Sequence, residues 1–227
     1  MNQIIRCTAI FSFIVAFSAT GLGAQETAGS YFNSISERYK SISDYTARLM
    51  ITRGGRTQVA LVQYKSPNLL RMDFSDPAGM VIAVDGDLMK VWVPEYSVTF
   101  EQTLRRNSTE LASAATARGL ELMARYYTVA YSESPNPVPL DPGSSERVIK
   151  LQLRWKSNNE GFRELEVSIS PALKTIRRIR GITTSGERIV FDFTNVALNK
   201  DIPVSRFSFD SPPTGNTIQN FLFDPEE

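Results

Sequence analysis

The sequence contains no histidine and a single cysteine, Cys7. Without histidine, a serine or cysteine nucleophile activated by an imidazole base is excluded. One cysteine cannot form an intramolecular disulfide, and a zinc site built from cysteine and histidine ligands is excluded as well. The sequence also has no Gly-x-Ser-x-Gly elbow and no phosphate-binding glycine loop. We therefore expect neither an enzyme nor a cofactor-binding protein.

A strong excess of one charge is also lacking, because 25 Lys and Arg balance 24 Asp and Glu. Residues 1–24 combine Arg6, an apolar run over 9–19 and small residues up to Ala24, which is typical of a cleaved secretory signal peptide. Its removal leaves a neutral chain, which disfavours nucleic acid or an anionic membrane surface as the main partner. We expect an exported protein without a membrane anchor, with 25–227 as one domain.

Short segments that alternate between apolar and polar residues dominate the sequence. In one of them Leu70, Met72 and Phe74 are apolar while the intervening residues are charged, so one face of this strand is apolar. Asp85-Gly86 is a two-residue hairpin signal between two further strands. Equivalent patterns predict strands over 45–52, 57–65, 80–84, 88–93, 97–103, 147–156, 161–169, 175–182, 188–194 and 207–209.

Two segments have helical periodicity instead. Ser30 is a candidate N-cap for an amphipathic helix over 31–43. Ser108 is a candidate N-cap for a second segment, which runs to about residue 127 and forms one bent helix or two short ones because a glycine interrupts it. Four prolines over 133–143 predict an exposed loop.

These elements define the expected fold class. Roughly ten or eleven strands with one apolar face each are too many for two short helices to cover if the sheet is flat. A strongly curved sheet that wraps around the helices solves this problem. We therefore predict a mainly β (α+β) protein, a strongly curved antiparallel sheet around short helices, with an apolar interior between sheet and helices that is partly open to a ligand.

Several short motifs resemble the LolA family of periplasmic lipoprotein carriers in order and spacing. They are Ser66-Pro67-Asn68-Leu69-Leu70-Arg71-Met72, the apolar strand that ends in Val84-Asp85-Gly86, Val91-Trp92-Val93-Pro94, and the tail from Ile202 to Gly215. The signal peptide, the first helix and the chain length agree with this family, so the resemblance covers essentially the whole mature chain. It implies a half-open barrel with a helical lid over an apolar cavity.

The resemblance also implies a function and a site. A monomeric periplasmic carrier would take acylated lipoproteins from an inner-membrane transporter and pass them to an outer-membrane acceptor. The expected ligands are lipoprotein or lipid acyl chains, and methionine adapts well to such irregular apolar ligands. The predicted cavity-lining residues are Leu70, Met72, Phe74, Met80, Ile82, Val84, Met89 and Val91 in the sheet, and Leu120, Leu122 and Met123 in the lid helix.

Two departures from the family pattern bear on the lid and the cavity. The arginine that precedes Pro-Asn in the family, and ties the lid down, is Ser66 here, with only Lys65 beside it. The aromatic residue after Pro-Asn-Leu and the tryptophan that follows are Leu70 and Met72, which predicts a more aliphatic cavity.

Alternative interpretations remain open at this point. The predicted cavity residues also fit a plain hydrophobic core. The basic cluster Arg177, Arg178 and Arg180 fits a docking patch or, more simply, a solvated strand face. The pair Glu164 and Glu166 is expected to be solvated surface, which leaves an esterase or glycosidase disfavoured. A periplasmic sensor of lipid or lipoprotein on the same fold is the second functional hypothesis.

Overall fold

The computed structural model describes residues 26–104, 115–156 and 161–221. The predicted signal peptide, Cys7 and the predicted N-cap Ser108 lie outside these residues. None of the helices in the described ranges is long and apolar enough to span a membrane.

The described residues form thirteen strands, two α-helices and two 3₁₀ helices. The helices are α1 (Ala28–Lys40), α2 (Ala117–Tyr126), η1 (Pro94–Tyr96) and η2 (Val204–Arg206). The strands are β1 (Asp44–Arg53), β2 (Arg56–Lys65), β3 (Leu69–Asp76), β4 (Ala78–Asp85), β5 (Leu88–Val93), β6 (Val98–Thr103), β7 (Tyr127–Tyr131), β8 (Val138–Pro139), β9 (Arg147–Trp155), β10 (Phe162–Ser170), β11 (Thr175–Thr183), β12 (Arg188–Leu198) and β13 (Asn216–Gln219).

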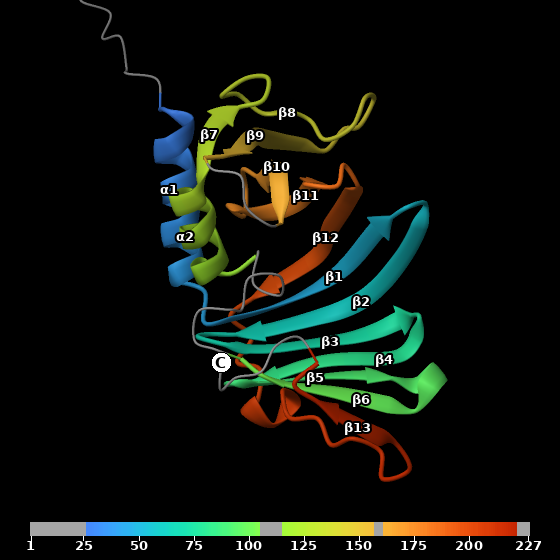
Figure 1. Ribbon diagram of the computed structural model, residues 1–227. Helices are drawn as coiled ribbons and strands as arrows, with labels where there is room; N and C mark the ends of the chain where they lie inside the picture. Colours follow the sequence, from blue (N-terminus) through green and yellow to red (C-terminus); the bar gives the residue numbers. More distant parts are fainter. Residues whose placement is uncertain (1–25, 105–114, 157–160, 222–227) are drawn as a thin grey trace, which may run out of the picture.

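All strands belong to one sheet. Its order is β13-β6-β5-β4-β3-β2-β1-β12-β11-β10-β9-β7, with β8 paired to β9 beside this path. Neighbouring strands are antiparallel except β13, which runs parallel to β6. The sheet curves through a wide arc, and α1 and α2 lie side by side near the β7 end (Figure 1). The predicted curved antiparallel sheet with two short helices is confirmed.

Some predicted elements differ from the structure. The strand expected over 207–209 is wrong: η2 ends at Arg206, and Phe207 follows in a turn. Phe207 is fully buried, so its side chain contributes packing without strand pairing. β13 and β7 were not predicted, because both are short and give weak alternation signals. β13 has four residues, all exposed, and β7 has five residues that directly follow a helix.

Helix α1 begins earlier than predicted. Its N-cap is Thr27, whose hydroxyl oxygen accepts a hydrogen bond from the Ser30 amide at 3.1 Å. The predicted cap Ser30 therefore lies inside the first turn. Phe32, Ile35 and Tyr39 form the buried stripe of this helix against the concave face of the sheet.

Helix α2 is capped at both ends by side chains. The Thr116 hydroxyl accepts a hydrogen bond from the Gly119 amide at 3.1 Å, so the glycine falls in the first turn and not in the middle of the helix. At the other end, Lys156 Nζ donates to the carbonyl oxygens of Ala124 and Arg125 at 3.3 and 3.0 Å. A cation at this end also opposes the negative end of the helix dipole.

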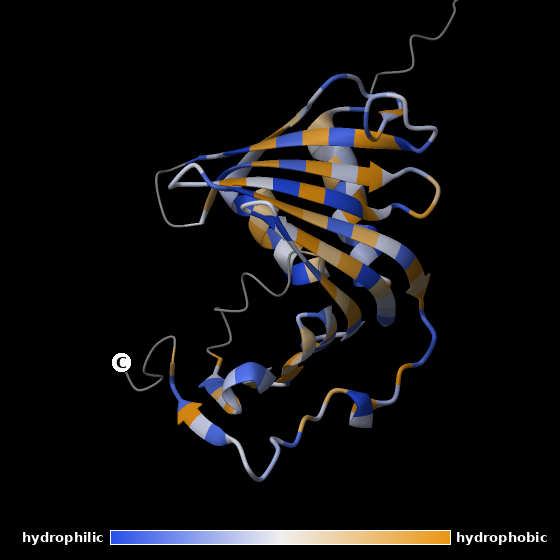
Figure 2. Cartoon of the chain, turned by 90° about the vertical axis from the view of Figure 1, so that its right-hand side faces the viewer, coloured by the Kyte–Doolittle hydropathy of each residue, from blue (hydrophilic) through white to orange (hydrophobic). Residues whose placement is uncertain are grey.

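The core lies between the two helices and the concave face of the sheet. Apolar residues alternate with polar ones along most strands, as the striped strands in Figure 2 show. Residues from α1, α2 and the strands of both halves of the sheet join in one cluster, among them Phe32, Leu120, Leu151 and Val167, which are at most marginally exposed. This shared core makes the curved sheet and the helices one folding unit.

The segment that follows β12 crosses the convex face of β2–β5. It is fixed at its start by the buried Asp44, whose carboxylate accepts hydrogen bonds from the amides of Lys200 and Asp201 at 2.7 and 3.1 Å. Farther along, Arg71 donates to the Ser208 carbonyl at 3.0 Å and lies over the Phe209 ring. The tail therefore covers the convex side of these strands, where Val81 and Ala83 of β4 are buried.

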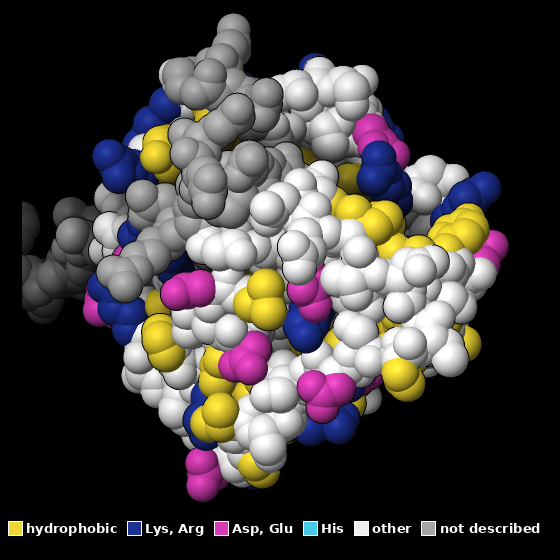
Figure 3. Space-filling view, turned by 60° about the horizontal axis from the view of Figure 1, so that its bottom comes forward, with side chains coloured by type: hydrophobic (Ala, Val, Ile, Leu, Met, Phe, Trp, Pro, Cys, Tyr) yellow, Lys and Arg dark blue, Asp and Glu magenta, His cyan; other side chains and the backbone are white. Residues whose placement is uncertain are grey.

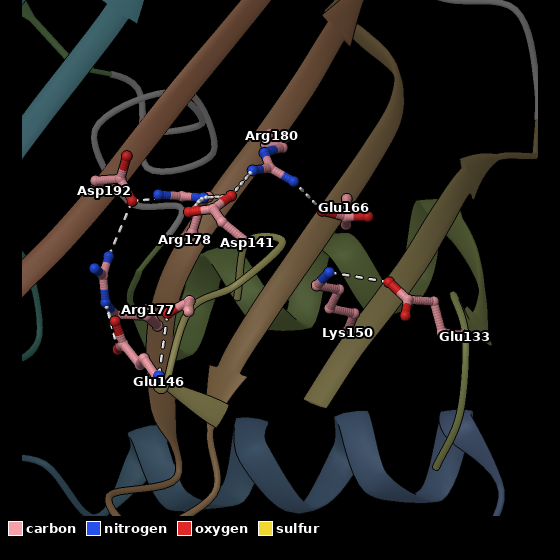
Figure 4. A network of polar contacts seen from close by, with 10 residues as sticks. Glu133, Asp141, Glu146, Lys150, Glu166, Arg177, Arg178, Arg180 and Asp192 are labelled. Carbon is pink, nitrogen blue, oxygen red and sulfur yellow. Dashed lines mark hydrogen bonds and ion pairs between the residues drawn. The ribbon is translucent and has the colours of Figure 1, made fainter. Parts of the chain in front are cut away.

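The loop with four prolines covers the convex face of the other half of the sheet. Leu140 is 3% exposed, and β8 pairs with β9, so this loop is not the freely exposed segment that its prolines predict. Asp141 accepts hydrogen bonds from Arg178 at 2.8 and 2.9 Å and from Arg180 at 2.7 Å (Figure 4). Ion pairs thus hold the loop against β11.

Candidate functional site

The eight predicted sheet residues share the concave face. In the register, Val62 of the core pairs with Met72, which pairs with Ile82, then Val91 and finally Phe100. A second row runs through Leu70, Val84 and Met89. Phe74 and Met80 alternate in phase with these residues along β3 and β4. Because directly paired residues point to the same side of a sheet, the two rows form one continuous apolar surface.

Burial divides this surface into two parts. Leu70, Phe74 and Val84 are buried, at 5%, 6% and 1% exposed. The others are partly exposed, and we call these residues, with Phe100, the concave patch: Met72, Met80, Ile82, Met89, Val91 and Phe100. Met72 and Met89 border the main core, whereas the other four do not belong to it. The patch is therefore the part of the concave face that the helices leave incompletely covered.

The predicted lid residues also differ from one another. Leu120 is fully buried and Met123 is 9% exposed, and both belong to the main core. Leu122 is only partly buried and lies outside that core. Leu120 and Met123 hold α2 on the sheet in this conformation.

The interior beneath α1 is closed. The void bounded by Tyr39, Tyr45, Ile176 and Phe193 has a volume of about 10 Å³, room for about one water molecule. Binding sites for small molecules have volumes of roughly 300–1,000 Å³. This void is therefore too small for such a ligand, whereas a more open groove of about 410 Å³ lies between α1, α2 and β7.

The residues at the expected latch position hold other parts of the chain. Lys65 Nζ donates to the Ile202 carbonyl at 2.8 Å and pairs with Asp201 at 3.3 Å, so it fastens the C-terminal tail. Ser66 donates its amide to the Ser43 carbonyl at 2.8 Å. Neither interaction involves α2.

Other contacts hold the helices in place. Lys40 of α1 pairs with Glu121 of α2 at 3.2 Å, an exposed ion pair of small energetic value. Lys156 caps the C-terminal end of α2. α1 is tied to β11, where the Ile176 amide donates to the Tyr39 hydroxyl oxygen at 2.9 Å in a buried setting. α2 is thus held in place by contacts from α1 and from Lys156, the residue that follows β9.

Two tyrosine hydroxyls are among the polar groups of the buried interior. Tyr39 and Tyr45 are buried, and burial raises the pKa of both phenols well above the ordinary value of 10.0. The Tyr45 ring also packs on the Tyr64 ring at a centroid distance of 5.4 Å. At physiological pH both phenols are neutral, so they add no charge to this part of the interior.

The basic cluster and the paired carboxylates belong to the structural network on the convex face. Arg177 bridges Glu146 and Asp192 at 2.7 and 2.9 Å, and its side chain is only 17% exposed. Glu166 pairs with Arg180 at 3.1 Å (Figure 4). Arg177 and Arg178 are therefore neither a free docking patch nor a solvated face. Within the described ranges, no group of three or more acidic or cysteine side chains is arranged to hold a metal ion.

Residues at the outer end of the concave surface were not predicted from the sequence. Phe100 continues the row of Met72, Ile82 and Val91, and Ile218 of β13 pairs with Phe100. The Phe221 ring packs on the Phe100 ring at a centroid distance of 5.3 Å. The alternation of Val98 and Phe100 with polar neighbours was a usable signal that Phe100 lies on the apolar face of β6. The pairing of β13 with β6 depends on the path of the C-terminal tail, and no local sequence pattern indicates it.

The outer surface contrasts with the concave patch. Figure 3 views the molecule from the β13 end, and hydrophobic side chains lie singly or in small groups between acidic and basic ones. Such scattered apolar residues are ordinary for a protein surface. The described part of this view therefore shows a typical solvated exterior.

The described residues thus form a curved antiparallel sheet whose apolar concave face is partly covered by two helices. The family model described as outer membrane lipoprotein carrier protein LolA matches residues 51–210. The chain therefore belongs to the LolA family. It is 22% identical over 153 residues to an outer-membrane lipoprotein carrier protein of Pseudomonas fluorescens, an alignment that covers 67% of this chain and 68% of the relative.

Solved structures support the same fold at low sequence identity. An uncharacterised conserved protein from Thermus thermophilus has a TM-score of 0.55 at 12% identity, covering 82% of this chain and 98% of the other. The lipoprotein LppX of Mycobacterium tuberculosis has a TM-score of 0.53 at 12% identity, with 78% and 97% covered. MucB in the Pseudomonas aeruginosa MucA/MucB complex has a TM-score of 0.52 at 9% identity, with 81% and 61% covered.

Proposed function

We propose that this protein is a periplasmic carrier that binds the acyl chains of lipoproteins on its concave face. The observation that carries the proposal is the continuous apolar surface of β3–β6, whose concave patch remains partly exposed beside a closed core. The family assignment supports the same role, because a lipoprotein carrier is what the family description names. Site residues in this proposal are the eight predicted sheet residues, Phe100, and the inner face of α2.

The energetics favour binding through hydrophobic burial. Each buried CH₂ group contributes about 0.8 kcal/mol, so several acyl chains together give a tight complex. The three methionines of the concave patch adapt their side chains to irregular apolar surfaces. Aliphatic walls form no directional bonds, so an acceptor with a somewhat more apolar cavity is able to remove the cargo.

Transport requires loading and release. In the proposed cycle the protein is exported by the segment 1–24, acts as a monomer, receives lipoproteins from an inner-membrane transporter and delivers them to an outer-membrane acceptor. Opening of α2 enlarges the apolar space, since Leu120 and Met123 are the side chains that fill it. No catalytic step is part of this function.

The test is formation of a soluble complex between delipidated protein and a triacylated lipoprotein at micromolar concentration. Ile82→Ser places a hydroxyl in the concave patch and is expected to weaken the complex. The matched control is Leu61→Ser, because Leu61 is 44% exposed and lies in the row of Asp73 on the opposite face. Absence of a complex with the wild-type protein, or equal weakening by both substitutions, contradicts the proposal.

A second function is favoured by the MucB structures: a regulatory module that senses lipid or lipoprotein and contacts a protein partner. The MucB structures have the same fold, and two of them are complexes with MucA. This chain spans 61% of the length of the MucB chain in the Pseudomonas aeruginosa complex. A stable protein complex recovered from the native envelope, without bound lipoprotein, is the result that favours the sensor over the carrier.

A further inference from the structure

The concave apolar surface continues to the last strand of the sheet. Ile218 of β13 pairs with Phe100, which places it in the same row as Ile82 and Val91. Two residues later the chain leaves β13, and the Phe221 ring rests on the Phe100 ring, 5.3 Å between centroids and tilted by 53°. A side chain of the protein itself therefore occupies the outer end of the concave patch.

The part of the chain that delivers Phe221 is held weakly. β13 has four residues, all exposed, and pairs with β6 alone at the edge of the sheet. Its ends are fixed by two backbone hydrogen bonds of 2.9 Å, from Asn216 to Ser97 and from Asn220 to Glu101. Short edge strands with exposed hydrogen bonds open locally at low free energy.

The segment before β13 is held much more firmly. Phe207 is fully buried, Arg71 and Lys90 donate to tail carbonyls, and a side chain at Gly215 would lie 2.8 Å from the Trp92 ring. Release is therefore expected to stop at Gly215, so that β13 and Phe221 move while the rest of the tail stays in place.

The Phe221 contact is also shallow. Its side chain is 37% exposed, and Ile218 is 46% exposed, although both are large apolar residues. An acyl chain that lies along the patch offers Phe100 a longer apolar partner than one tilted ring does.

We propose that Phe221 is a built-in competitor for the ligand: it covers the outer end of the concave patch in the empty protein, and an acyl chain displaces it together with β13. This inference rests on the proposed function. The competition lowers the affinity of the protein for acyl chains. Release of the cargo is therefore easier, because Phe221 and β13 return to their place as the acyl chain leaves.

The test measures binding of palmitate that bears a fluorophore at its carboxyl end, with the full chain and its Phe221→Ala variant. One aromatic pair is worth about 0.5–1.5 kcal/mol, so the variant is expected to bind roughly two- to tenfold more tightly. Tyr96→Ala is the matched control, because Tyr96 is a 68% exposed aromatic residue in η1, and its removal is expected to leave the affinity unchanged.

Hydrogen exchange of the β13 amides is the second readout. In the wild type, exchange is expected to speed up when the palmitate probe is added, since displacement frees this strand. Unchanged or weaker binding of Phe221→Ala, or slower exchange of β13 with the probe, overturns the inference and makes Phe221 a clamp or a bystander. If neither wild type nor Phe221→Ala binds the probe or the triacylated lipoprotein, the proposed function itself fails.

Discussion

The contact between Tyr39 and Ile176 tests how α1 is fixed to the sheet. The Ile176 amide donates to the Tyr39 hydroxyl oxygen at 2.9 Å. Both residues are buried, with Ile176 1% and Tyr39 6% exposed. The substitution Tyr39→Phe preserves the ring but leaves this buried amide without its acceptor. An unsatisfied buried donor costs about 1–3 kcal/mol, so the free energy of unfolding is expected to fall by that amount. The corresponding fall in melting temperature is roughly 2–12 °C for a chain of this size.

Urea unfolding followed by circular dichroism measures this change. The midpoint is expected to shift to lower urea at an unchanged m-value, because the substitution alters stability and not the surface exposed on unfolding. Tyr131→Phe is the control: its hydroxyl donates to the Glu26 carbonyl at 3.1 Å in an exposed setting, and its loss is expected to cost no more than about 0.5 kcal/mol. Equal stability of Tyr39→Phe and the wild type refutes the assignment of this hydrogen bond as the anchor of α1.

Two further predictions concern the loop and the lid. The hydrogen bonds from Arg178 lower the pKa of Asp141 below its ordinary value of 3.8. A carboxyl group whose pKa is lower in the folded state than in the unfolded state stabilises the protein at pH values above the unfolded-state pKa. This contribution is lost as the pH falls through the folded-state pKa. Unfolding titrations should therefore show Asp141→Asn as less stable at neutral pH, with the difference vanishing in strong acid; a difference that persists there contradicts this reasoning. In α2, Leu120→Ala is expected to lower the free energy of unfolding by about 2–5 kcal/mol because Leu120 is fully buried. Leu122→Ala, at a partly buried position, is expected to lower it clearly less. Equal losses of stability in thermal melting would show that α2 packs differently.

Much of the fold follows from local patterns. The alternation of Leu70, Met72 and Phe74 with charged residues, and the hairpin signal at Asp85-Gly86, locate the ends of β3 to β5 to within two residues. The shortage of helices requires a curved sheet, and this conclusion holds without any knowledge of the register. The concave face of β3–β5 was predictable for the same reason, because a strand with one apolar face has only one way to bury it.

The remaining features depend on contacts between distant segments. The role of the four-proline loop follows from Asp141 meeting Arg178, residues that no local pattern connects. Phe207 has strand-like neighbours but reaches its buried position from a 3₁₀ turn, so alternation misassigned it. Lys65 fastens the tail and not the lid, which only the path of the tail after β12 reveals.

The place where the acyl chain lies is the central claim, and photo-crosslinking measures it directly. A palmitate that carries a diazirine on its acyl chain is bound to the wild-type protein, and the complex is irradiated. The modified peptides are then identified by mass spectrometry. We predict adducts on the concave patch, at Met72, Met80, Ile82, Met89, Val91 or Phe100. Adducts confined to the convex face, around Leu61 or the tail residues beside Arg71, would contradict it.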